Sequence, residues 1–390
     1  MLVKSIIIKL VLKMEEKVLK NIPLFKVFMP ANVIEPLKKV LYSGYIGQGK
    51  EVEEFEKGLR EFIGNPYGLA LDSGTHALNL ALHLANVKPG DEVISTPLTC
   101  IATNSPIKEI GAIIKWADIC PDTGNMDPNS IERLITPKTK TIIYVHWAGN
   151  PGDIDKINEI ASKYNIKVIE DAAHSFGAEY KGKKLGCHSD FVMFSFQAIK
   201  HMTTGDGGAL FCKNKEDFDR GRALRWFGLD RNKIEEEKRW YYDIEEIGYK
   251  YNMNNIDATI GIEQLKYIKE NLEKHRRNGK FYDERLSKIS GIKTLRQEEG
   301  VNSVYWVYTF LADKRKSLIE YLNNHGINNS IVHIRNDIYT CFKEFKSKFP
   351  LEGLDKFSEK YISIPCGWWV SEEDARYIVN TIKKFYNYKL

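Results

Sequence analysis

Short apolar runs alternate with segments of helical periodicity from about residue 50 onward. β-Branched and aromatic residues follow one another within these runs, as in strands that are covered on both faces. The runs are residues 92–95, 141–145, 166–169, 191–194 and 209–211. A helix is predicted over residues 75–86, and the Pro89-Gly90-Asp91 turn separates it from the first run. This order predicts an α/β fold with βαβ units and a mostly parallel sheet flanked by helices.

The apolar period changes near residue 262. Leucine, isoleucine and phenylalanine then recur at helical spacing through a strongly charged segment that ends near residue 288. We predict a long connecting helix here, followed by a smaller C-terminal α+β domain. The expected domains are an N-terminal extension over residues 1–20, a large domain with its N-terminal arm over residues 21–262, and the connecting helix with the small domain over residues 263–390.

Composition and charge are those of a globular protein. The chain has 390 residues, 43% of them hydrophobic, and its net charge of +5 comes from 57 basic and 52 acidic residues that are mixed along the sequence. A nucleic-acid-binding face needs clustered lysine and arginine, so we expect no nucleic acid partner. The six cysteines are scattered without a C-x-x-C pair, which favours free thiols in a reducing compartment.

The first twenty residues are apolar but interrupted by lysines. Lys4, Lys9 and Lys13 leave no uninterrupted run of signal-peptide length, and the segment is too short to span a membrane. We expect a translated extension ahead of a start at Met14. The sequence therefore predicts a cytoplasmic, soluble protein with no membrane partner.

Three segments carry candidate chemistry. The first, residues 195–208, directly follows an apolar run and contains Lys200. Open α/β sheets bind ligands at the carboxyl ends of their strands. A partly desolvated lysine at such a place has a lowered pKa and can form a Schiff base with an aldehyde. In a chain with 57 basic residues, however, a single lysine is more often structural.

The second segment, residues 168–178, puts Asp171 at the carboxyl end of another predicted strand. A carboxylate beside a pyridine nitrogen keeps that nitrogen protonated and makes the ring an electron sink, although an aspartate after a strand is more often a helix cap. In the third segment, Ser73, Gly74 and Thr75 begin a predicted helix. The N–H groups and hydroxyls there form either a phosphate cradle or an ordinary helix cap.

Taken together, these segments resemble the sugar aminotransferase family typified by the DegT, DnrJ, EryC1 and StrS proteins, which are pyridoxal-phosphate (PLP) enzymes of fold type I. The resemblance covers nearly the whole chain from about Pro23. Further matching blocks are residues 22–25, 43–49, 52–56, 89–94, 145–151, 252–254 and 264–265. The resemblance implies an aspartate-aminotransferase-like fold, PLP as the cofactor, no metal, and a homodimer with shared active sites.

The resemblance also implies roles for individual residues. Lys200 would bind the cofactor as an internal aldimine and shuttle the proton between two carbon atoms, and Asp171 would pair with the pyridinium nitrogen. His174 lies where relatives often have glutamine near the ring oxygen, and a histidine there could titrate. The phosphate would be held by Ser73, Gly74, Thr75 and Ser195.

One phosphate contact is expected to come from the neighbouring subunit. In relatives, the segment around Asn252 reaches across to the phosphate of the other subunit. Lys250 lies two residues earlier in the chain and is an alternative for the same contact.

Three departures from the family pattern leave the amino acceptor open. Many relatives have an aromatic residue stacked on the cofactor ring where this chain has Cys100, so another group is expected to cover the ring. The block that contains His333 and Arg335 differs from the usual aromatic-proline pattern. These two are candidate substrate-binding residues, and Arg335 could bind a phosphate or carboxylate or be an ordinary surface arginine. Trp147 occupies a position that is more often aliphatic.

The leading hypothesis is a glutamate-dependent aminotransferase that acts on a keto-sugar, most often nucleotide-linked in this family, for surface polysaccharide or related amino-sugar biosynthesis. An alternative keeps the transamination but uses a small phosphorylated ketone or a keto sugar acid. Related sugar dehydratases replace the lysine by histidine, whereas this chain keeps Lys200 with His201 beside it. A non-catalytic regulator of the same fold is disfavoured because the lysine, the aspartate and the phosphate cradle are all retained.

Overall fold

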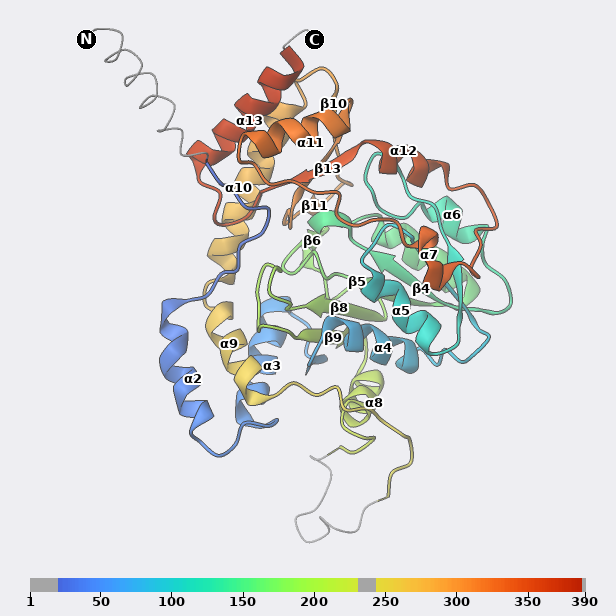
Figure 1. Ribbon diagram of the computed structural model, residues 1–390. Coiled ribbons are helices and arrows are strands. Elements are labelled where there is room, and N and C mark those ends of the chain that lie inside the picture. The colour runs from blue at the N-terminus through green and yellow to red at the C-terminus, as the bar shows by residue number, and fades with distance from the viewer. Residues whose placement is uncertain (1–19, 231–242, 388–390) are drawn as a thin grey trace, which may run out of the picture.

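The computed structural model describes residues 20–230 and 243–387, and a seven-stranded sheet lies at its centre (Figure 1). The strand order is β1-β9-β8-β5-β4-β2-β3. The strands are β1 Gly68–Leu71, β2 Glu92–Ser95, β3 Ile113–Trp116, β4 Thr139–Val145, β5 Lys167–Asp171, β8 Phe191–Ser195 and β9 Gly208–Cys212. All five strands expected from the apolar runs are present, with β2 at the expected bounds and the ends of the other four within two residues of the expected positions.

The sheet is parallel from β3 through β8, and only β9 runs against its neighbours β8 and β1. Its residues alternate between two cores. Ile143, Ile169 and Met193 face one side, whereas Val192 and Phe194 face the other. This is the period-two pattern of strands that are covered on both faces. The prediction of a mostly parallel α/β sheet flanked by helices is confirmed.

Helices cover both faces of the sheet. The helices α4 (Gly74–Leu84), α5 (Ile101–Glu109) and α8 (Lys215–Leu224) supply side chains to one core. The helix α3 (Lys50–Ile63) lies against the opposite face and packs on α9 (Asn255–Leu265). The helices α2 (Ile34–Leu41), α6 (Pro128–Glu132) and α7 (Ile154–Tyr164) complete this part of the chain. The helix expected over residues 75–86 is α4, which ends two residues earlier than expected.

The expectation of one long helix over residues 262–288 was wrong. The structure has two helices here, α9 (Asn255–Leu265) and α10 (Ile268–Leu286). The helical path breaks between Leu265 and Ile268, where Tyr267 has a φ of −109° and a ψ of −6°, far from the usual helical values of about −63° and −42°. No proline or glycine lies at the break, and the apolar residues keep their helical spacing across it. The sequence pattern therefore gives no sign that the helix is interrupted. The expected domain boundary at residue 262 falls within α9 and stays a prediction.

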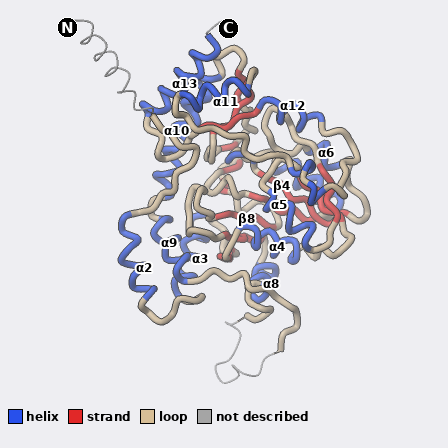
Figure 2. Tube along the Cα trace, in the orientation of Figure 1, coloured by secondary structure: helices blue, strands red, loops and turns tan. Residues whose placement is uncertain are grey.

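A second, antiparallel sheet follows in the chain. It contains β10 (Ile292–Thr294), β12 (Tyr308–Ala312) and β13 (Tyr361–Ile364), in that order. The helices α10, α11 (Arg315–Asn324) and α13 (Glu372–Asn387) pack with this sheet in one hydrophobic cluster, and Figure 2 shows them grouped around it. The remaining elements are α12 (Glu352–Lys360) and a small sheet of β11 (Val301–Asn302), β6 (Glu179–Tyr180) and β7 (Lys183–Lys184).

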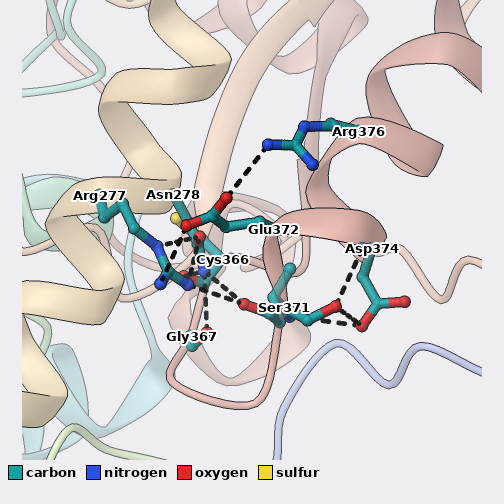
Figure 3. Close-up of polar contacts among 9 residues, drawn as sticks. Arg277, Asn278, Cys366, Gly367, Ser371, Glu372, Asp374 and Arg376 are labelled. Carbon is teal, nitrogen blue, oxygen red and sulfur yellow. Dashed lines mark hydrogen bonds and ion pairs between the residues drawn. The ribbon is translucent and has the colours of Figure 1, made fainter.

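Asn278 of α10 fixes the turn that leads into α13 (Figure 3). Its Nδ2 donates to the carbonyl oxygens of Cys366, Gly367 and Val370 at 3.0–3.2 Å. The next helix begins with Ser371 and Asp374 bonded to each other through side chain and backbone. A buried amide with three carbonyl partners therefore ties two helices that are about ninety residues apart in the chain.

The predicted N-terminal extension lies outside the described residues, apart from Lys20. Lys20 pairs with Glu373 and Asp374 at the start of α13. Among the residues that the structure describes, no helix is both long and apolar enough to cross a lipid bilayer.

Candidate active site

A cavity of about 330 Å³ lies where the carboxyl ends of β5 and β8 meet the first turn of α4. Eight of the ten predicted site residues line it: Ser73, Gly74, Thr75, Asp171, His174, Ser195, Lys200 and His333. A larger cavity of about 500 Å³ lies between α3 and α8, but none of the predicted residues lines it. Its walls carry ion pairs between arginines and carboxylates, such as Arg222 with Asp219. We therefore assign the smaller cavity as the candidate site.

The first wall is the start of α4. The Oγ of Ser73 accepts a hydrogen bond from the N–H of His76 at 3.1 Å, so Ser73 caps the helix. The N–H groups of Gly74 and Thr75 belong to the first turn, which has no partners within the helix. Gly74 lies directly against Ser195, because a Cβ added to Gly74 would come within 3.0 Å of the Ser195 Cβ. The hydroxyls and N–H groups at the start of α4 and at the end of β8 therefore lie together at the N-terminus of α4, which is the positive end of its dipole.

The second wall carries the acid. Asp171 is the last residue of β5 and is buried. Its Oδ2 accepts from the hydroxyl of Thr103 at 2.6 Å, and its Oδ1 accepts from the N–H of Ala173 at 3.1 Å. Burial raises the pKa of the Asp171 carboxyl, while these two hydrogen bonds and the charge of Lys200 oppose that rise. An ionised carboxylate can only accept hydrogen bonds, so the hydroxyl of Thr103 uses its proton to donate to Asp171. The hydrogen bond of 2.7 Å between Thr99 and Thr103 must therefore be donated by Thr99.

The third wall carries the amine. Lys200 follows β8, and its Nζ lies 4.0 Å from the centre of the Trp306 indole. Enclosure by the cavity walls lowers the pKa of the Lys200 amine to about 8, against the opposing influence of Asp171 and Cys100. An amine with this pKa is partly unprotonated near neutral pH and can act as a nucleophile or base.

A stack of rings closes the site beside the amine. The His174 ring lies 3.9 Å from that of Trp306 at an interplanar angle of 8°, and the His333 ring lies 5.5 Å from that of His174. The Nδ1 of His174 and the Nε2 of His333 are buried without a hydrogen-bond partner in the described structure. Burial and the nearby Lys200 hold the pKa of His174 well below its usual value and that of His333 at about 4. Both imidazoles are therefore neutral at pH 7 and free to bind a ligand.

Two predicted site residues do not line the cavity. Asn252 pairs its backbone with Leu71, and its Oδ1 accepts from Nζ of Lys250 at 2.6 Å. The guanidinium of Arg335 donates to both carboxylate oxygens of Asp337 at 2.7 and 2.6 Å and also to Asp355. Asp337 and Asp355 thus bind all three nitrogens of the Arg335 guanidinium away from the cavity lining.

Cys100 and Trp147, which depart from the family pattern, lie in the cavity wall and directly behind it. Cys100 lines the cavity just before α5. Trp147 is buried behind the two histidines, with its ring edge-on to His174 at 6.3 Å and to His333 at 6.5 Å. The aromatic surface of the cavity therefore comes from Trp306 and the two imidazoles.

Sequence reasoning missed Thr103 and Trp306. The only signal for Thr103 is its spacing of four residues from Thr99, which brings two hydroxyls together around the start of a helix. Trp306 belongs to an aromatic and aliphatic run just before β12, and such a run indicates core packing. Among the described residues, no three His, Cys, Asp or Glu side chains are placed to share a metal ion.

Comparison with known proteins gives the family context of this site. The model of the DegT/DnrJ/EryC1/StrS aminotransferase family matches residues 29–383. The chain is 33% identical over 357 residues to the UDP-4-amino-4,6-dideoxy-N-acetyl-beta-L-altrosamine transaminase of Campylobacter jejuni, covering 90% of this chain and 93% of the relative.

Two solved structures are also similar over almost their whole length. A sugar aminotransferase of Micromonospora echinospora has a TM-score of 0.89 at 36% identity, with 93% of this chain and 99% of the other covered. The PLP form of a putative sugar aminotransferase of Streptococcus pneumoniae has a TM-score of 0.85 at 30% identity, with 94% and 98% covered.

Proposed function

Because the chain belongs to the DegT/DnrJ/EryC1/StrS aminotransferase family, we propose that it is a PLP-dependent enzyme that transfers the amino group of glutamate to a nucleotide-linked keto-sugar, for surface polysaccharide or related amino-sugar biosynthesis. The observation that carries this proposal is that the Lys200 amine and the Asp171 carboxylate line one cavity beside the first turn of α4. The relative whose name specifies a UDP-linked amino sugar supports a nucleotide-linked acceptor.

The residues present fit PLP. The close approach of Gly74 to Ser195 leaves backbone N–H groups and hydroxyls accessible to a phosphate. Asp171 is a buried carboxylate that suits a protonated pyridine nitrogen, and the unpartnered Nδ1 of His174 suits the ring hydroxyl. Lys200, with its lowered pKa, suits the aldehyde carbon.

Each residue then has a distinct task. When bound, PLP supplies an electron-withdrawing ring that stabilises negative charge on the carbon that loses its proton. Asp171 holds a proton at the ring nitrogen, and Thr103 keeps Asp171 oriented and charged. Lys200 would hold the cofactor, and its amine would carry the proton between the two carbon atoms of the transfer. The neutral rings of His174 and Trp306 exclude water from Lys200.

His333 is the candidate contact to the acceptor. It lines the cavity, and its buried Nε2 can donate to or accept from a sugar hydroxyl because the ring is uncharged. We do not assign Arg335 a substrate contact, since Asp337 and Asp355 already bind its guanidinium.

We further propose a homodimer in which Asn252 contacts the cofactor phosphate of the neighbouring subunit. A cluster of exposed apolar side chains in the N-terminal arm, in α2 and in the loop that follows α2 supports an interface, because monomeric proteins rarely expose so many together. The cluster consists of Val27, Met29, Ile34, Leu41, Tyr42, Tyr45 and Ile46. Asn255, three residues after Asn252, donates to the Tyr45 carbonyl, so this cluster adjoins the Asn252 segment.

The half-reaction with glutamate tests the proposed function. We expect purified protein loaded with PLP to change its absorption spectrum on addition of glutamate and to release 2-oxoglutarate. The Lys200→Ala variant should lose turnover, whereas Lys213→Ala, at an exposed lysine after β9, should keep it. Transaminase activity retained by Lys200→Ala would exclude the assigned role of Lys200.

A further inference from the structure

Trp306 lies between the small strand β11 and the strand β12, in a segment whose backbone is bonded to residues that follow β4. Its backbone N–H donates to the carbonyl oxygen of Ala148 at 2.9 Å. The side chain is buried and forms part of the wall of the candidate site. Trp306 therefore reaches the site from a part of the chain more than one hundred residues beyond Lys200.

The indole makes two different contacts with the segment that carries the amine. Its Nε1–H donates to the carbonyl oxygen of Ile199 at 2.8 Å. Its face lies 4.0 Å from Nζ of Lys200. The first contact fixes the backbone immediately before the lysine, and the second attracts the ammonium group through the negative face of the ring.

Neighbouring rings fix the indole itself. His174 stacks on it at 3.9 Å and 8°, and Phe25 of the N-terminal arm stacks at 4.9 Å and 30°. A side chain that is stacked, hydrogen-bonded and buried has few alternative rotamers. The contacts to Ile199 and Lys200 are consequently preorganised.

We propose that Trp306 is a positioning residue for Lys200: the indole N–H anchors the backbone at Ile199, and the indole face directs the lysine amine into the cavity before the cofactor binds. This inference rests on the proposed function of Lys200. In the reaction, Trp306 would act through the lysine and would not take part in proton transfer.

The indole face also affects the charge of Lys200. A cation over an indole face is stabilised, so Trp306 favours the ammonium form and opposes the effect of burial on the pKa. Asp171 and Cys100 also favour that form, and the two cavity histidines are neutral. Replacing the indole by leucine keeps an apolar wall around the amine but removes the ring face, so it should lower the pKa of Lys200 below about 8 and leave the side chain less well oriented.

Apoprotein variants separate the two contacts. Trp306→Phe keeps a ring face but lacks the N–H donor, whereas Trp306→Leu lacks both. Trp116→Phe is a matched control, because the buried Trp116 also donates its Nε1–H to a backbone carbonyl, that of Phe345 at 2.6 Å, and does not line the cavity. Circular dichroism and thermal unfolding report whether each variant folds.

Two measurements on the apoprotein test the proposal. The first is the pH dependence of Lys200 acylation by an amine reagent, followed by peptide mass spectrometry. We expect its midpoint to fall by about half a pH unit in Trp306→Leu and to stay unchanged in Trp116→Phe. The second is the rate of PLP incorporation, which should fall about tenfold or more in both Trp306 variants because the amine is misplaced.

An unchanged midpoint in Trp306→Leu, or unchanged incorporation in Trp306→Phe, would overturn the proposal and leave Trp306 as a packing residue. Should the leucine variant fail to fold, the incorporation rate of the phenylalanine variant decides. The acylation midpoint needs no cofactor. It therefore tests the contact between Trp306 and Lys200 even if PLP were to bind a different lysine.

Discussion

Burial and charge act in opposite directions on Lys200 and Asp171. Enclosure disfavours both ions, so it lowers the pKa of the amine and raises that of the carboxyl, while the attraction between the two groups opposes both shifts. The hydroxyl of Thr103 and the N–H of Ala173 also donate hydrogen bonds to Asp171, and these bonds stabilise its charged form. The result suits an acid that stays charged and an amine that can lose its proton.

The reactivity of Lys200 should follow its lowered pKa. Only the free amine attacks an aldehyde, and the fraction of free amine rises as pH increases through the pKa, which is about 8. We expect the initial rate of PLP incorporation into apoprotein to rise about fivefold from pH 7 to pH 8 and then to level off by about pH 9. Stopped-flow absorbance across pH 6–10 measures this profile. A rate that continues to rise towards pH 10.5 would show an ordinary exposed lysine.

Most of the candidate site was predictable from sequence because its residues adjoin the ends of strands. Asp171 ends β5, Ser195 ends β8 and Ser73 caps α4, so local position already brings them together. Trp306 and the partners of Arg335 were not predictable, since they depend on contacts between segments far apart in the chain.

The strand β1, which leads into the start of α4, is held by a buried ion pair. Glu56 of α3 accepts from the N–H of Ala70, and Arg225, just after α8, donates to the carbonyl of Ala70 at 2.7 Å and to Glu56. Arg60 also pairs with Glu56 at 2.8 Å. Two helices are therefore joined to one strand through a single carboxylate.

Breaking this pair should destabilise the protein strongly. In Arg225→Leu, Glu56 stays buried with one partner fewer, and we expect a loss of about 3–5 kcal/mol in the free energy of unfolding. Denaturant titration of the apoprotein measures it. Lys57→Leu, which removes an exposed pair with Glu61 on the same helix, is the control and should change stability far less. Equal effects of the two substitutions would contradict the assigned role of the pair.

The strands of the large sheet were easier to predict than the helices around residue 266. A strand covered on both faces is a continuous apolar run, and β2, β5 and β8 therefore stand out in the sequence. The break between α9 and α10 was not visible, because Leu265 and Ile268 keep helical spacing on either side of it. The strand β1 was missed because its four residues include Gly68 and no β-branched or aromatic side chain.

At the scale of the whole molecule, the pattern of residues indicated the fold class, whereas the homodimer was implied only by the family resemblance and stays a prediction. The apolar cluster in the N-terminal arm, in α2 and in the loop that follows α2 becomes apparent only when exposure is known. In sequence, the apolar residues of this region are not distinguishable from those that pack inside, such as Val33 and Val40.

A mixing experiment tests the proposed sharing of sites. If Asn252 acts on the neighbouring subunit, Lys200→Ala and Asn252→Ala fail for different reasons and can complement each other. Random mixing gives about half hybrid dimers, each with one intact site, so activity should recover to about a quarter of the wild-type value. Analytical ultracentrifugation of the same samples shows whether dimers form. Activity that stays at the sum of the two unmixed variants would exclude a contribution from the neighbouring subunit.

The central claim is that Lys200 is the residue to which PLP is bound. Borohydride reduction of the PLP-loaded protein makes that linkage permanent, and peptide mass spectrometry then identifies the modified lysine. We predict a single phosphopyridoxyl group, on the peptide that contains Lys200 and opposite the acid at Asp171. A modification found on any other lysine, with Lys200 unmodified, would contradict the account.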